Sequence, residues 1–172
     1  MNLAVITSHR STCCRRNVGC VLLDARGHVL ATGYNGVAAG LPHCNEERWC
    51  PEGADPKKSA VSSPVKIEKA VGCVSAMTQA FYPHACPGAK AASGTNLDGC
   101  HAIHAEQNAL LQCRDVYSIE TCYTTTSPCI TCVKLLMNTS CQRIVFRDEY
   151  PHQEARKIWE DSGREWKNIG EC

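Results

Sequence analysis

The segment from Cys100 to Cys132 constrains this chain more than any other part of its sequence. It carries His104-Ala105-Glu106 and, further on, Pro128-Cys129-Ile130-Thr131-Cys132. One histidine and two cysteines are three ligands that Zn²⁺ prefers, and a catalytic zinc keeps its fourth position open for water. Glu106 need not bind the metal and is therefore available for proton transfer. The pattern predicts a catalytic zinc on His104, Cys129 and Cys132, with Glu106 as the proton shuttle.

Both halves of this motif are expected at the starts of helices. Pro128 suits a helix start, where its missing N–H costs no hydrogen bond. Cys129 and Cys132 are three residues apart and project from one face, where the positive end of the helix favours thiolates. His104 opens an apolar periodic run that predicts a second helix. The alternatives are a closed structural zinc site and a chance arrangement among the 14 cysteines.

Length and charge exclude several classes of protein. The 172 residues are enough for one complete core, and we expect a single domain over residues 1–172. The formal net charge of +1 offers no sequence-wide basic excess for nucleic-acid binding. No apolar run approaches the roughly 18 residues of a membrane span, and residues 1–10 lack a signal-peptide core. We expect no nucleic-acid or membrane partner, and a cytoplasmic protein whose cysteine clusters bind metals.

Strand and helix patterns alternate along the chain. A short helix is expected in residues 1–10, followed by a hairpin of two strands at 18–24 and 28–33. Further helices are expected after His104, after Pro128 and over 151–162, with strands at 119–126, 143–147 and 165–169. This alternation predicts an α/β sandwich with parallel pairing late in the sheet.

Residues 41–101 differ in character from the rest of the chain. They are rich in proline, cysteine and histidine, and their apolar content is too thin for a core of their own. We therefore interpret them as an insertion within the single domain, with a helix over 65–82 and a loop over 85–99. The loop Gly33-Tyr34-Asn35-Gly36 lies before the insertion, and its glycines let backbone approach a ligand closely. An ordinary glycine turn is the alternative.

The chain resembles the deoxycytidylate (dCMP) deaminases of the cytidine deaminase superfamily, and most of all their bacteriophage form. The resemblance covers nearly the whole length. Its His-x-Glu and Pro-Cys-x-x-Cys motifs are those of zinc deaminases in general, whereas the glycine loop and Tyr150 are typical of the deoxycytidylate branch. The matching residues are Cys13-Cys14 before Val18-Gly19, Gly33 to Gly36 with Gly40, His104-Ala105-Glu106 with Asn108-Ala109, Ser127 to Cys132, and Tyr150 after Asp148.

The resemblance implies a three-layer α/β/α fold with a mixed five-stranded sheet. It implies zinc-dependent hydrolytic deamination of dCMP to dUMP, the precursor for dTMP synthesis. In that reaction Asn35 is expected to hydrogen-bond the sugar, and Tyr150 to contact the nucleotide. The phosphate needs a cation or backbone N–H groups, and the sequence does not choose among Arg15, Arg16, Arg114 and Arg147.

The resemblance also implies a homohexamer that is activated by dCTP and inhibited by dTTP. We expect the protein to lie in the cytoplasm, which is that of the host cell if the protein is viral. We expect Mg²⁺ to accompany the regulatory triphosphate. The expected nucleotide site comprises residues around the glycine loop and the nearby arginines: Arg15, Arg16, Asn17, Gly33, Tyr34 and Gly36.

A second, structural zinc is expected as well. A loop-rich insertion with few apolar residues needs an additional stabilising cross-link. A closed metal site provides one, because the free energy of metal binding adds to the free energy of folding. Phage relatives use an acidic ligand where this chain has Ala102. The expected ligands are Cys13, Cys44, Cys86 and His101, with His84 and Cys100 as alternatives to Cys86.

Two other functions compete with this interpretation. The first is a deaminase acting on a base in tRNA or single-stranded DNA, which needs a basic groove and stacking aromatic residues. A net charge of +1 and 6% aromatic residues argue against it. The second is a non-catalytic zinc module, in which protein would fill the fourth position of the metal. The presence of Glu106 argues against that module.

Overall fold

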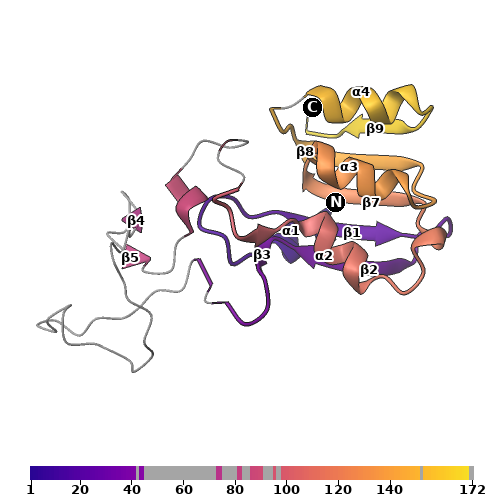
Figure 1. Cartoon of the computed structure of the whole chain (residues 1–172). Coiled ribbons are helices and arrows are strands. Elements are labelled where there is room, and N and C mark those ends of the chain that lie inside the picture. The colour runs from indigo at the N-terminus through magenta and orange to yellow at the C-terminus, as the bar shows by residue number, and fades with distance from the viewer. Residues whose placement is uncertain are drawn as a thin grey trace, which may run out of the picture.

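A five-stranded mixed sheet forms the centre of the computed structural model, which describes residues 1–41, 43–44, 73–74, 81–82, 86–90, 95, 98–151 and 153–170. The strand order is β2-β1-β7-β8-β9 (Figure 1). β1 pairs antiparallel with β2 and β7, whereas β8 is parallel to both β7 and β9. The predicted parallel pairing late in the sheet is confirmed. The strands are β1 (Gly19–Leu23), β2 (Val29–Tyr34), β7 (Thr121–Thr126), β8 (Arg143–Asp148) and β9 (Glu165–Asn168).

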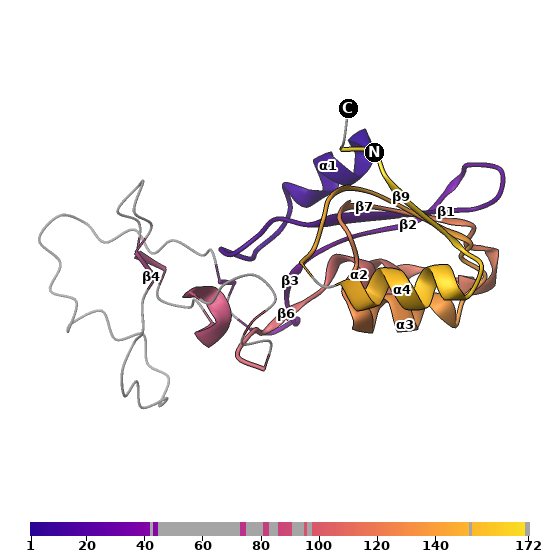
Figure 2. The same ribbon diagram turned by 90° about the horizontal axis from the view of Figure 1, so that it is seen from above.

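Helices cover both faces of this sheet. The helix α1 (Asn2–Ser8) lies on one face, and α2 (Ala105–Gln112), α3 (Ile130–Met137) and α4 (Gln153–Asp161) lie on the other (Figure 2). α3 and α4 share a face because each connects parallel neighbouring strands, and such crossovers are almost always right-handed. The predicted three-layer α/β/α arrangement is therefore confirmed.

The core lies between the sheet and the three helices on its second face. Trp159 of α4 and Phe146 of β8 are its largest fully buried side chains. The indole N–H of Trp159 donates to the carbonyl oxygen of Glu165 at 2.9 Å, so this buried donor is satisfied. Within the part of the chain that the structure describes, no helix combines the length and apolar character needed to span a membrane.

Gly33 lets α2 lie directly against β2. A Cβ atom at this position would lie 2.2 Å from the carbonyl oxygen of Ala105 and 2.4 Å from the amide nitrogen of Ala109. Both distances are far below van der Waals contact, so only glycine fits. The close approach determines where α2 begins, and with it the position of His104 and Glu106.

The ends of the insertion return to the same place in the fold. Gly36–Val37 (β3) pairs antiparallel with Ala102–Ile103 (β6), one strand on each side of residues 41–101. Within the insertion, Cys73–Val74 (β4) pairs with Phe81–Tyr82 (β5), and Pro87–Lys90 form a 3₁₀ helix. The helix predicted over 65–82 is therefore wrong at those four strand residues, where valine and aromatic residues favour strands. Its other residues lie outside the described part of the chain.

Candidate active site

The three predicted zinc ligands meet where two helices begin. His104 is the N-cap of α2, Cys129 is the N-cap of α3, and Cys132 lies in the first turn of α3. Nδ1 of His104 is 3.4 Å from each sulfur, and the two sulfurs are 3.7 Å apart. Tetrahedral zinc with bonds of about 2.3 Å to sulfur and 2.0–2.1 Å to nitrogen needs separations of roughly 3.6 and 3.8 Å. The three side chains therefore fit Zn²⁺.

The protonation of these groups also suits a cation. The hydrogen bond with Cys132, and a further one with His104, lower the pKa of Cys129 to about 4. The same hydrogen bond, together with burial, raises the pKa of Cys132. The hydrogen bond with Cys129 raises the pKa of His104. One thiolate is thus favoured before any metal binds, and a bound cation would favour the second.

Glu106 is a buried carboxyl group beside this cluster. It lies in the first turn of α2 and its residue surface is only 3% exposed. Burial raises its pKa, and the nearby charge of His104 opposes that shift. None of the ion pairs among the described residues includes Glu106. A buried carboxyl group with a raised pKa is suited to taking up and releasing a proton during a reaction.

A cavity of about 90 Å³ opens over Glu106 and two of the metal ligands, His104 and Cys129. The predicted substrate residues Asn35 and Tyr150 both line it, although 115 positions separate them in the sequence. Arg15 and Arg16 line it too, so the structure brings part of the predicted regulatory nucleotide site to the catalytic cavity.

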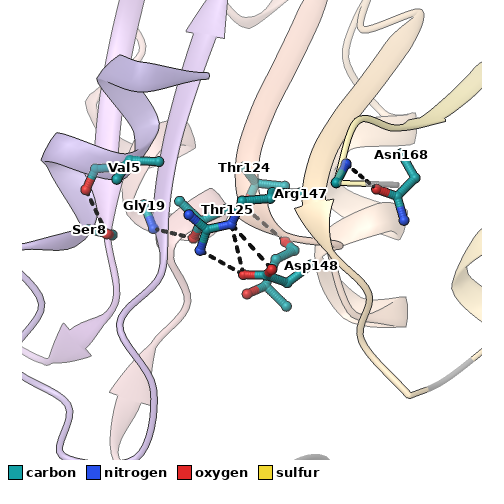
Figure 3. A network of polar contacts seen from close by, with 10 residues as sticks. Val5, Ser8, Gly19, Thr124, Thr125, Arg147, Asp148 and Asn168 are labelled. Carbon is teal, nitrogen blue, oxygen red and sulfur yellow. Dashed lines mark hydrogen bonds and ion pairs between the residues drawn. The ribbon is translucent and has the colours of Figure 1, made fainter. Parts of the chain in front are cut away.

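The other two candidate phosphate ligands lie elsewhere. Arg114 is exposed and is not among the described residues that line the cavity. Arg147 pairs with Asp148 at 2.8 Å on β8 (Figure 3). Of the four arginines that the sequence left open, Arg15 and Arg16 are therefore the ones at the site.

Hydrogen bonds at the end of β7 hold in place the segment that carries Thr126 and Ser127, two residues that line the cavity. The Thr125 hydroxyl accepts from the amide of Gly19 on β1 at 3.2 Å, and the Thr124 hydroxyl donates to the carbonyl oxygen of Thr126 at 2.9 Å (Figure 3). The amide of Ser127 donates to the carbonyl oxygen of Asp148 at 2.8 Å. The chain that runs from β7 into Cys129 is thus tied to the strands on both sides.

Ser127 is a site residue whose role the sequence did not predict. Its hydroxyl accepts a hydrogen bond from the amide of Tyr150 at 2.7 Å, which holds the tyrosine at the cavity. Burial raises the pKa of Tyr150, as does the thiolate of Cys129, whereas Arg15 and Arg16 lower it. Tyr150 therefore stands within electrostatic reach of both the metal ligands and the arginines. Ser127 precedes Pro128 in the zinc motif, and this adjacency was the one available signal.

The candidate ligands of the second zinc are only partly together. Cys13, Cys44 and Cys86 are buried, whereas His101 is exposed and His84 lies outside the described residues. Burial raises the pKa of Cys44 to about 12, and its thiol hydrogen-bonds with Cys86. Burial raises the pKa of Cys100, and the charges of the nearby Cys86 and Cys13 raise it further. Among the described residues, only His104, Cys129 and Cys132 have all their ligand atoms within 4.8 Å of one another.

Comparison with known proteins decides the family. The family model for the cytidine and deoxycytidylate deaminase zinc-binding region matches residues 1–148 of this chain. The chain belongs to this deaminase family. The resemblance to deoxycytidylate deaminases is thereby confirmed, and the family's zinc-binding character agrees with the geometry of the His104, Cys129 and Cys132 site.

Individual deaminases match over most of the chain. The deoxycytidylate deaminase of Enterobacteria phage T2 is 30% identical over 190 residues, which cover 99% of this chain and 95% of the phage protein. That of Schizosaccharomyces pombe is 31% identical over 153 residues, or 87% of this chain and 36% of the yeast protein. This chain spans less than half the length of the two yeast relatives that it matches.

A solved deaminase structure has the same fold. The dCMP deaminase from the cyanophage S-TIM5 aligns with a TM-score of 0.60 at 20% sequence identity, covering 98% of this chain and 92% of its own. That protein has been solved in apo form and in complex with dCMP and dUMP. The predicted cytidine deaminase-like fold is confirmed.

Proposed function

We propose that this chain is a zinc-dependent hydrolase that deaminates dCMP to dUMP and so supplies the precursor for dTMP synthesis. The observation that carries the proposal is the buried carboxyl group of Glu106 in a cavity beside three side chains that fit zinc. Deoxycytidylate deaminases among the relatives, and a neighbour solved with dCMP and dUMP, support this choice of substrate.

In this mechanism Glu106 moves the protons. His104, Cys129 and Cys132 would hold the zinc, which would supply a Lewis acid for activating a water molecule. Glu106 would accept one proton from that water and deliver it to N3 of the cytosine as the water oxygen adds to C4. It would then take the second proton from the new C4 hydroxyl and give it to the amine, which leaves as ammonia when the C4–N4 bond breaks. Its pKa, raised by burial, lets the carboxyl group hold a proton between these transfers. The products are dUMP and ammonia.

Residues outside α2 and α3 would orient the nucleotide over the Glu106 carboxyl group. We assign the sugar to Asn35 and one side of the nucleotide to Tyr150, because both line the cavity. The phosphate is assigned to Arg15 and Arg16, which also line the cavity, since guanidinium groups bind phosphate through charge-assisted hydrogen bonds.

The substrate is tested by measuring ammonia release from dCMP, dCTP, deoxycytidine and CMP side by side. We expect dCMP to have the highest kcat/KM, because a bound phosphate adds binding energy that can be used at the transition state. Equal values for dCMP and deoxycytidine would contradict a phosphate site. Release of no ammonia from any of the four by zinc-loaded protein would contradict the function itself.

We also propose a second, structural zinc that involves Cys13, Cys44 and Cys86. The burial of these three cysteines and the hydrogen bond between Cys44 and Cys86 support it. For the fourth ligand, His101 is exposed, whereas Cys100 lies within electrostatic reach of Cys86 and Cys13. The proximity of Cys100 favours it over His101.

Metal analysis should find two zinc ions per chain. Cys44→Ser is expected to lose one of them and to lower the melting temperature, because the metal contributes folding free energy. Cys113→Ser is the matched control, since Cys113 lies at the end of α2 and its thiol hydrogen-bonds to a nearby carbonyl. One zinc per chain in fully reconstituted wild-type protein would contradict the second site.

Regulation by nucleoside triphosphates completes the proposal. We expect dCTP to activate and dTTP to inhibit, each with Mg²⁺, in a cytoplasmic homohexamer, within the host cell if the protein is viral. The sequence led us to expect contacts at Arg15, Arg16, Asn17, Gly33, Tyr34 and Gly36. Because the two arginines line the catalytic cavity and are assigned to the substrate phosphate, the regulatory contacts that we propose are Asn17, Gly33, Tyr34 and Gly36. Regulation requires different affinities for the two states of the enzyme. The dCMP saturation curve should therefore move to lower concentration with dCTP and to higher concentration with dTTP. A curve that neither nucleotide moves would refute this regulation.

A further inference from the structure

One guanidinium nitrogen of Arg16, Nη1, is buried and has no hydrogen-bond partner among the described residues. Arg16 lines the cavity that also contains Glu106 and Cys129. Buried donors in native proteins are nearly always paired, so an unpaired one in a cavity calls for a partner that arrives with a ligand. An anion supplies the acceptor, and phosphate is the anionic group of the proposed substrate.

Asn35 holds the main chain on which Arg16 stands. Its side-chain Nδ2 donates to the carbonyl oxygen of Arg16 at 2.7 Å, and its Oδ1 accepts from the amide of Val18 at 2.7 Å. Its main-chain amide also donates to the carbonyl oxygen of Val18 at 3.2 Å. The segment that carries Arg16 is thereby attached to Asn35 on either side of Asn17.

Ser11 and Val18 together fix which way the amide of Asn35 faces. The Ser11 hydroxyl lies 2.7 Å from Oδ1 and 2.9 Å from the main-chain oxygen of Asn35, both of which accept from it. With Oδ1 engaged by Ser11 and Val18, the amide nitrogen is directed at Arg16. Ser11 is 5% exposed and is not among the described residues that line the cavity. Its influence on the cavity therefore passes through Asn35.

We propose that Ser11 is a positioning residue: it helps orient Asn35, which holds the main chain of Arg16 in place, and the guanidinium on that main chain binds the 5′-phosphate of the substrate in the cavity. The proposal rests on the deaminase function given above and names the group that distinguishes a nucleotide from a nucleoside. Arg16 contacts the phosphate, whereas Ser11 and the side-chain amide of Asn35 hold the main chain of Arg16 in position.

The test compares dCMP with deoxycytidine, which lacks the phosphate. Arg16→Met is expected to lower kcat/KM for dCMP by about 10- to 100-fold and to leave deoxycytidine within about threefold. Ser11→Ala is expected to raise KM for dCMP by about 3- to 10-fold with kcat little changed, and to raise KM for deoxycytidine by less, because that substrate shares the sugar contact with Asn35 but lacks the phosphate. Arg16→Lys keeps the charge and should restore part of the loss.

Two matched controls isolate the effect. Ser8→Ala removes another buried serine, which donates to the carbonyl oxygen of Val5 at 2.6 Å and does not contact Asn35. Arg26→Met removes an exposed arginine in the turn between β1 and β2. Neither control should change the ratio of dCMP to deoxycytidine kcat/KM.

Other results would overturn the proposal. Equal losses with both substrates in Ser11→Ala would show that Ser11 acts on the shared sugar contact of Asn35 and not on Arg16. A lower melting temperature with an unchanged ratio would show that Ser11 serves folding alone. An unchanged ratio in Arg16→Met would remove Arg16 from the phosphate site. Calorimetric binding of dUMP and deoxyuridine repeats the comparison without turnover. If the wild-type protein deaminated none of the substrates, the proposed function would be contradicted. The positioning role of Ser11 would still be tested, because the binding comparison does not depend on turnover.

Discussion

Glu106→Gln is expected to lower the rate of dCMP deamination by about 10²- to 10⁴-fold, the usual contribution of a positioned acid–base group. Glutamine nearly matches glutamate in shape but cannot accept and release the protons that the reaction moves. Because Glu106 belongs to none of the ion pairs among the described residues, its replacement breaks no salt bridge there. The measurement is ammonia release under saturating dCMP.

Zinc content and melting temperature must be measured on the same variant. Both are expected to match the wild type, because the three metal ligands are unchanged. Glu154→Gln is the matched control, since Glu154 lies in the first turn of α4, is exposed, and does not line the cavity. A Glu106→Gln protein that keeps more than about a hundredth of wild-type turnover would remove Glu106 from the mechanism.

Gly33→Ala is expected to lower the free energy of unfolding by about 3 kcal/mol, the upper end of the usual range for overpacking. The new Cβ would lie 2.2 Å from the Ala105 carbonyl oxygen and 2.4 Å from the Ala109 amide nitrogen. Both are backbone atoms, so no side-chain rotation can relieve the contact, and α2 must move. For a chain of this size the melting temperature should fall by roughly 6–12 °C. Activity should fall as well, because His104 and Glu106 move with α2.

Gly27→Ala separates this clash from the general cost of replacing glycine. Gly27 has a φ of +85°, and a Cβ atom at this position would have no other atom within 4 Å, so alanine there meets strain but no clash. We expect a cost of about 1–2 kcal/mol and unchanged zinc content and activity. If Gly33→Ala melts no lower than Gly27→Ala, the close approach of α2 to β2 is not what determines the site.

The sequence predicted the elements of the fold because each depends on local pattern. Short runs rich in apolar or β-branched residues mark β1, β7 and β8, and the periodic apolar positions of residues 151–162 mark α4, where Trp159 is fully buried. The helix expected over 65–82 shows the limit of this reasoning. A periodic apolar stripe there suggested a helix, yet residues 73–74 and 81–82 pair as strands.

The metal ligands and Glu106 were predictable for the same reason, because their spacing is local. His104 and Glu106 are two residues apart, and Cys129 and Cys132 are three apart, so each pair belongs to one helix start. Spacing within a helix turn is determined by backbone geometry, which the sequence specifies directly.

Only the tertiary structure decided which residues line the cavity together with Glu106 and two of the metal ligands. The strand order places β1 beside β7, and β7 beside β8, so the segments that carry Arg16 and Tyr150 reach the same end of the sheet. The choice of Arg15 and Arg16 over Arg114 and Arg147, and the contact of Ser11 with Asn35, follow from that order. These contacts join residues that lie far apart in the sequence. The packing of the whole sheet brings them together, and no local spacing in the sequence encodes that packing.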